Sequence, residues 1–117
     1  MTPLARLLAE VEAGPLWDID DPFSVPSKDV SDLIRASFAH EDGWSDFCEA
    51  YASKDVTAAI SLCGAMLPGV RMEIIGPYDD GLWLVNLPDQ DSVINTNPAR
   101  ALLIALLRAM VAREGGE

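Results

Sequence analysis

The residue types that could carry chemistry lie closest together around His40, the one histidine of the chain. Glu41 and Asp42 follow it, and Cys48 comes eight positions later. A structural zinc site needs about four ligands at defined spacing. A nucleophilic thiol needs a lowered pKa and a base held by a third group. Neither pattern is present, so we expect an exposed histidine at the C-terminus of a helix, where the dipole favours it.

A second group of oxygen ligands is formed by Asp18, Asp20 and Asp21. In a calcium-binding loop that started at Asp18, the sixth position would be Gly, but here it is Phe23. We therefore expect an acidic loop in contact with solvent rather than a metal site. The other carboxylates do not lie in the apolar setting that acid–base catalysis requires. We predict no catalytic residue, no metal and no cofactor.

The acidic residues are concentrated in the first half of the chain. Residues 10–55 contain twelve acidic and three basic side chains, whereas residues 98–113 contain three arginines and no acid. A pI near 4.2 disfavours direct binding to nucleic acid or to anionic membranes. Residues 101–112 are the longest apolar run, which is shorter than the roughly 20 residues of a membrane span. With no signal-peptide pattern and two cysteines read as reduced thiols, we expect a cytoplasmic protein.

The periodicity of apolar residues predicts the elements that must position these side chains. Helical spacing covers 3–13, with Thr2 as its cap, and 28–38, capped by Ser27. A short helix around 44–51 follows, then a helix over 54–67 capped by Ser53. Alternation predicts strands at 70–76, 82–87 and 92–96, with a hairpin turn at 78–81, before a helix over 98–113 that Asn97 caps.

This order predicts an α+β fold in which a three-stranded antiparallel sheet packs against the C-terminal helix. We expect one domain over 1–117, with an acidic helical lead-in at 1–52 and a core at 53–117. The C-terminal helix is apolar on nearly all sides, so it must be buried on more than one side. It either packs wholly inside the chain or contacts a second copy in a homodimer through Leu103, Leu107 and Met110.

From residue 53 onward the chain resembles a known family. It reads Ser-Lys-Asp-Val-Thr-Ala-Ala-Ile-Ser-Leu over 53–62, Leu-Pro-Gly over 67–69 and Asn-Thr-Asn-Pro-Ala-Arg-Ala-Leu-Leu over 95–103, with Trp83 in the hairpin. This cadence resembles the phage ABA-sandwich domain found in small phage and prophage proteins, most closely over 53–113. The resemblance implies a phage origin and helix–sheet–helix layering. It brings no catalytic residue.

Together these features suggest a protein that binds a basic protein surface, such as that of a nucleic-acid-binding protein, without catalysis. The expected contacts are seven acids, with Trp17 and Trp44 as aromatic anchors or as core residues: Asp18, Asp20, Asp21, Glu41, Asp42, Asp46 and Glu49. A phage protein of this kind could inhibit a host defence complex as a DNA mimic, for example as an anti-CRISPR protein. The acids could instead only confer solubility. The alternative function is a virion assembly accessory that acts through homo-oligomerisation of the C-terminal helix.

Overall fold

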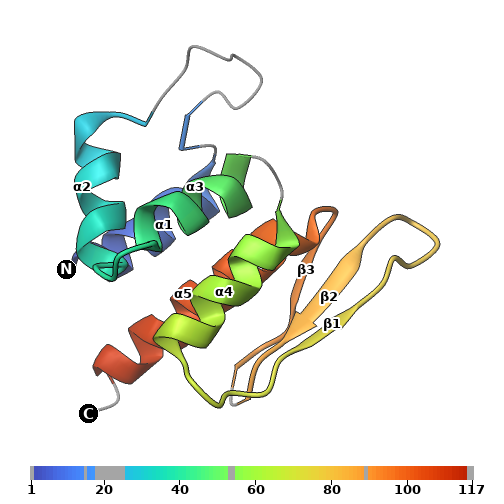
Figure 1. Ribbon diagram of the computed structural model, residues 1–117. Helices are drawn as coiled ribbons and strands as arrows, with labels where there is room; N and C mark the ends of the chain where they lie inside the picture. Colours follow the sequence, from blue (N-terminus) through green and yellow to red (C-terminus); the bar gives the residue numbers. More distant parts are fainter. Residues whose placement is uncertain (1, 15, 18–25, 53–54, 89, 116–117) are drawn as a thin grey trace.

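The computed structural model describes residues 2–14, 16–17, 26–52, 55–88 and 90–115. In these residues the helices are α1 (Pro3–Ala13), α2 (Lys28–Ser37), α3 (Gly43–Ala52), α4 (Val56–Met66) and α5 (Pro98–Gly115). The strands are β1 (Glu73–Ile75), β2 (Trp83–Asn86) and β3 (Val93–Asn95). The predicted α+β class is confirmed, since the antiparallel sheet, in the order β1-β2-β3, packs against α5 (Figure 1).

Side-chain caps begin most of the helices where the sequence predicts them. The Thr2 Oγ1 atom accepts a hydrogen bond of 3.2 Å from the Ala5 N–H, and the Ser27 Oγ atom accepts one of 3.3 Å from the Val30 N–H. The Asn97 side chain accepts from the Ala99 N–H at 3.0 Å. Each bond satisfies an amide that the first turn of a helix leaves without a partner.

The start of α4 differs from the prediction. Asp55 caps this helix, because its carboxylate accepts a 3.2 Å hydrogen bond from the Ala58 N–H. The helix therefore begins at Val56 rather than at residue 54. The predicted cap, Ser53, lies outside the described residues. Asp and Ser are both strong capping residues, so the sequence pattern alone did not distinguish them.

The sheet is a meander of short strands whose register places apolar side chains in rows across it. Ile74 lies opposite Val85, and Val85 lies opposite Val93. Val85 and Val93 are buried and α5 packs against β2 and β3, so this row lies on the face that α5 covers. Neighbouring residues of a strand point to opposite faces of the sheet. The residues adjacent to this row in each strand therefore lie on the face that α5 does not cover.

Helix α5 is the centre of the fold. It packs against α1, α3 and α4 as well as against β2 and β3. Leu103 and Leu107 are 0% exposed and Met110 is 8% exposed, within the single chain. The prediction that these three residues form a dimer contact is therefore wrong. They belong to the core, because other elements of the same chain surround the helix. The alternative, that α5 is buried within the chain, accounts for its apolar character.

Helix α5 packs on one face of the sheet, and the two edge strands differ in what lies beside them (Figure 1). Strand β3 packs against α5, whereas β1 makes its main contacts with β2 alone. In the described residues no helix covers the second face, which differs from the helix–sheet–helix layering that the family resemblance implies. No helix in this part of the chain has the length and apolar character needed to cross a membrane.

Candidate functional site

The acidic residues expected to bind a partner lie partly on α3. Asp18, Asp20 and Asp21 lie outside the described residues. Glu41, Asp42 and Glu49 are exposed, and Asp46 is half-buried. The spacing of Asp42, Asp46 and Glu49 by four and three residues puts them on one face of a helix. We name these three residues the acidic stripe; Glu41 lies directly before it.

The local sequence explains how α3 presents the stripe. The Gly43 N–H bonds to the His40 carbonyl at 3.1 Å, and the Asp46 N–H bonds to the Asp42 carbonyl at 2.9 Å. A Cβ atom at Gly43 would overlap the Phe38 carbonyl oxygen, so a residue without a side chain allows α3 to start close to the end of α2. Gly43 itself is buried, whereas Asp46 and Glu49 of the acidic stripe lie on another face of the same helix and Asp42 directly precedes it.

Trp44 connects α3 to α2 on the other side of the helix. The guanidinium carbon of Arg35 lies 4.5 Å from the centre of the Trp44 ring, a cation–π contact. The ring is half-buried and packs against the core. One side of Trp44 is therefore covered by Arg35, and the residue helps to hold two helices together whether or not it also anchors a partner.

Trp17 is also half-buried, and it packs against α3. Its ring centre lies 4.7 Å from that of Tyr51, with the planes tilted by 39°. The Tyr51 ring in turn stacks on Phe47, with centres 6.1 Å apart, and the guanidinium carbon of Arg100 lies 4.5 Å from its centre. Trp17 therefore packs against the core, which was one of the two roles expected for it.

The residues around His40 do not form the environment of a catalytic thiol. Burial raises the pKa of the Cys48 thiol, and this effect outweighs the opposite influence of the Arg35 charge. Burial also raises the pKa of the Cys63 thiol to about 12. Both shifts favour the neutral thiol, which is a poorer nucleophile than the thiolate. Both cysteines are free.

His40 itself departs from the prediction of an exposed side chain. It is half-buried, and among the described residues neither of its ring nitrogens, both shielded from solvent, has a hydrogen-bond partner. Helix α2 ends at Ser37, three residues earlier, so His40 lies in the turn that leads into α3. The sequence did not reveal this burial, because it depends on how closely α3 folds back on α2.

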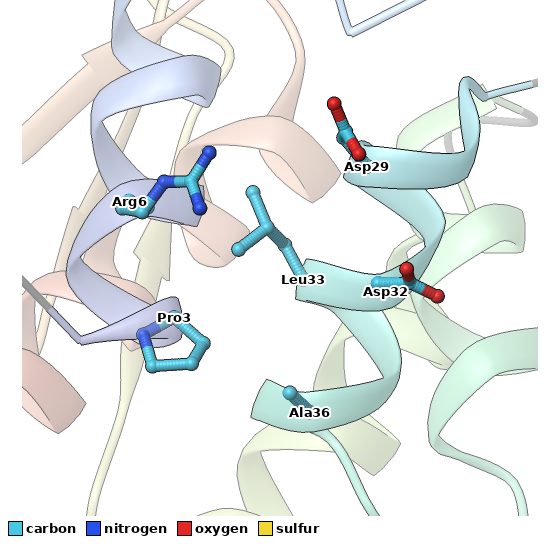
Figure 2. Close-up of a pocket in the computed structure, with 6 residues that line it drawn as sticks. All are labelled: Pro3, Arg6, Asp29, Asp32, Leu33 and Ala36. Carbon is cyan, nitrogen blue, oxygen red and sulfur yellow. The ribbon is translucent and has the colours of Figure 1, made fainter.

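A shallow pocket of about 380 Å³ lies between α1 and α2. Figure 2 shows Arg6 on α1 facing α2, whose Leu33 side chain points into the space between the helices. Asp29 and Asp32 lie along α2 at its rim. The pocket is open and mixed in charge. Such a shape can take a side chain of a partner but does not enclose a small substrate.

The uncovered face of the sheet has an apolar row that the sequence analysis missed. Ile75, Leu84 and Ile94 lie opposite one another across the three strands. Ile75 is 42% exposed and Ile94 is 58% exposed, while Leu84 is half-buried. The signal was present in the sequence, because two apolar residues in succession, Ile74 and Ile75, must place one of them on the outer face.

In the described part of the chain, no three His, Cys, Asp or Glu side chains lie close enough together to hold a metal ion. Comparisons with family models, with curated proteins and with solved structures find no match to this chain.

Proposed function

We propose that this chain is a non-enzymatic binding protein that contacts a basic surface of a protein partner through the acidic stripe. The observation that carries the proposal is the helical spacing of Asp42, which directly precedes α3, with Asp46 and Glu49 on that helix; Asp42 and Glu49 are exposed and Asp46 is half-buried. Helix α3 contains no lysine or arginine that could neutralise them. A partner would supply the positive charge that this helix lacks.

Electrostatics favours this arrangement as a docking surface. Like charges at four-residue spacing destabilise an isolated helix by about 0.2–0.5 kcal/mol per pair. A basic partner would convert that repulsion into attraction and would accelerate encounter by long-range steering. The alternative is structural, since acids in the first turn of a helix interact favourably with its dipole. That role accounts for Asp46 in the first turn of α3 and for Asp42 directly before it, but not for Glu49 in the second half of the helix.

The finer proposal concerns the kind of partner. A row of carboxylates on one rigid helix can substitute for the phosphates that a nucleic-acid-binding protein recognises. With the resemblance to phage proteins, this supports an inhibitor of a host nucleic-acid-handling defence complex that acts in the bacterial cytoplasm. The two free cysteines agree with a reducing compartment.

A second candidate function is a virion assembly accessory that acts by self-association. The apolar row of Ile75, Leu84 and Ile94 favours it, because it leaves apolar surface of the sheet exposed. This self-association would involve the sheet, since the C-terminal helix is buried within the chain.

The test is capture of partners from host-cell lysate by the tagged chain at about 50 mM and about 300 mM salt. The acidic stripe is neutralised with Asp42→Asn, Asp46→Asn and Glu49→Gln. The matched control makes the same change in net charge at three exposed acids elsewhere, with Glu10→Gln, Asp79→Asn and Asp91→Asn. We expect salt and the stripe variant to release the same partner, while the control variant retains it.

Two results would contradict this proposal. Equal loss of the partner from both triple variants would show that net charge alone attracts it. Retention of the partner at high salt would rule out an electrostatic contact, because exposed charges are screened over about 10 Å or less at that ionic strength.

A further inference from the structure

The free edge of the sheet has a sequence that complements itself. Strand β1 is the outer strand of the order β1-β2-β3, and beyond it the described residues place no other strand; residues 70–72 lead into β1 and would extend it in the pairing considered below. Val70, Met72 and Ile74 pack against the core but are only half-buried. An edge strand with unpaired backbone groups is a template for another strand.

The five residues from 70 to 74 read Val-Arg-Met-Glu-Ile. If a second copy runs antiparallel with Met72 opposite its own counterpart, Arg71 of each chain lies opposite Glu73 of the other. Val70 of each chain then lies opposite Ile74 of the other. Every charge thus meets the opposite charge and every apolar residue meets an apolar one. Arg71 and Glu73 are exposed, and neither forms an ion pair within the described residues.

Other registers lack this property. A one-residue shift would place inward-facing side chains opposite outward-facing ones, which the pleat of a sheet forbids. A symmetry axis at residue 71 would bring the two Arg71 side chains together, and an axis at residue 73 would do the same for Glu73. A parallel arrangement in register would pair each charge with its own kind. Only the antiparallel pairing about Met72 joins the opposite charges.

The pairing would also bury more of the apolar side chains that are only half-buried in the single chain. Ile74 lies on the inward side of β1, since it shares its row with the buried Val85, and Val70 and Met72, which precede the strand, are half-buried against the core. A second β1 strand beside them would cover their free flank, and the apolar face of the sheet would continue from one chain into the other. The two three-stranded sheets would become one sheet of six strands.

We propose that two copies of this chain associate through antiparallel pairing of residues 70–74, with a two-fold axis at Met72 and reciprocal Arg71–Glu73 contacts. This dimer surface is independent of the acidic stripe, so each proposal can fail alone. Five residues per chain is far fewer than the roughly 20 per side of a standard interface. The dimer therefore dissociates on dilution. The competing role for the two charges is protection of the edge against aggregation.

The experiment is sedimentation velocity of the full chain from micromolar to millimolar concentration. Arg71→Glu places like charges opposite each other in its own homodimer, and so does Glu73→Arg. Each variant alone is expected to dissociate about tenfold more readily than the natural chain, because two cross-strand pairs change sign. An equimolar mixture of the two variants restores opposite charges at both positions, so it is expected to associate as well as the natural chain.

Arg113→Glu and Glu10→Arg make the same charge changes at exposed sites away from β1 and are the matched controls. They are expected to behave as the natural chain. Circular dichroism of every variant verifies the fold, and the mixture shows that each variant retains a usable strand. A natural chain that stays monomeric to millimolar concentration would overturn the proposal and leave the charges as edge protection. A mixture no tighter than its separate variants would also overturn it.

Discussion

The hydroxyl of Tyr51 accepts a 2.7 Å hydrogen bond from the backbone N–H of Leu16, which precedes it by 35 residues. The Tyr51 side chain is itself 1% exposed, among Trp17, Phe47 and Arg100. A single phenol thus ties the segment after α1 to α3 and α5. This contact fixes where Trp17 lies and links the acidic first half of the chain to the core helix.

Removal of the Tyr51 hydroxyl tests how much this hydrogen bond contributes to stability. Tyr51→Phe keeps the ring but leaves the partly buried Leu16 N–H without its acceptor, which we expect to lower the free energy of unfolding by about 1–3 kcal/mol. Urea unfolding followed by tryptophan fluorescence measures the loss. Tyr78→Phe is the matched control, because Tyr78 is an exposed tyrosine in the hairpin. Equal stability of the two variants would show that the Leu16 bond contributes nothing.

Because α5 is buried, we can distinguish core residues from residues of an interface between two copies by the effect of their substitution on stability. Leu103→Ala removes a fully buried side chain, so we expect it to lower the free energy of unfolding by about 2–5 kcal/mol. Ile94→Ala, at an exposed position on the outer sheet face, should cost less than about 1 kcal/mol. Chemical unfolding measures both. If Leu103→Ala instead changed the oligomeric state at unaltered stability, the residue would lie in an interface.

The buried thiol of Cys63 predicts a stability loss at high pH. Its folded-state pKa is about 12, against an ordinary value of 9.0. Below pH 9 the thiol is protonated in both states, so its contribution is fully present. As the pH rises from 9 towards 12, the unfolded chain releases the proton first and becomes favoured. The folded state should lose about 1.4 kcal/mol per pH unit from this group.

Unfolding in urea with a reducing agent at pH 8, 9 and 10 measures this effect. Cys63→Ala removes the titrating group and should show a shallower fall in stability over the same range. The difference between the natural chain and the variant is the quantity to follow, since other groups titrate equally in both. Parallel curves for the two proteins would mean that the thiol ionises as easily in the folded state as in the unfolded one.

The sequence by itself determined the elements, because their signals are local. The caps at Thr2, Ser27 and Asn97 lie where a side-chain acceptor reaches the amides of the next turn. Three-and-four spacing marked the helices, and alternation marked the strands, whose observed bounds lie within the predicted ones. The apolar character of residues 98–113 required burial on several sides, which the structure provides. The acidic residues of α3 were identified from composition, and their helical spacing follows from their numbers alone.

Only the tertiary structure decided which surfaces are covered. The sequence left open whether Leu103 faces a second copy or the core, because burial depends on the three helices α1, α3 and α4 and on the sheet that pack against α5. It did not reveal that Arg35 covers Trp44 or that the nitrogens of His40 are shielded, since both depend on how α2 approaches α3. The free β1 edge, and the alignment of Ile75, Leu84 and Ile94 in one row, likewise appear only once the strand order and register are known. Local patterns specify elements, but exposure is a property of how the elements pack.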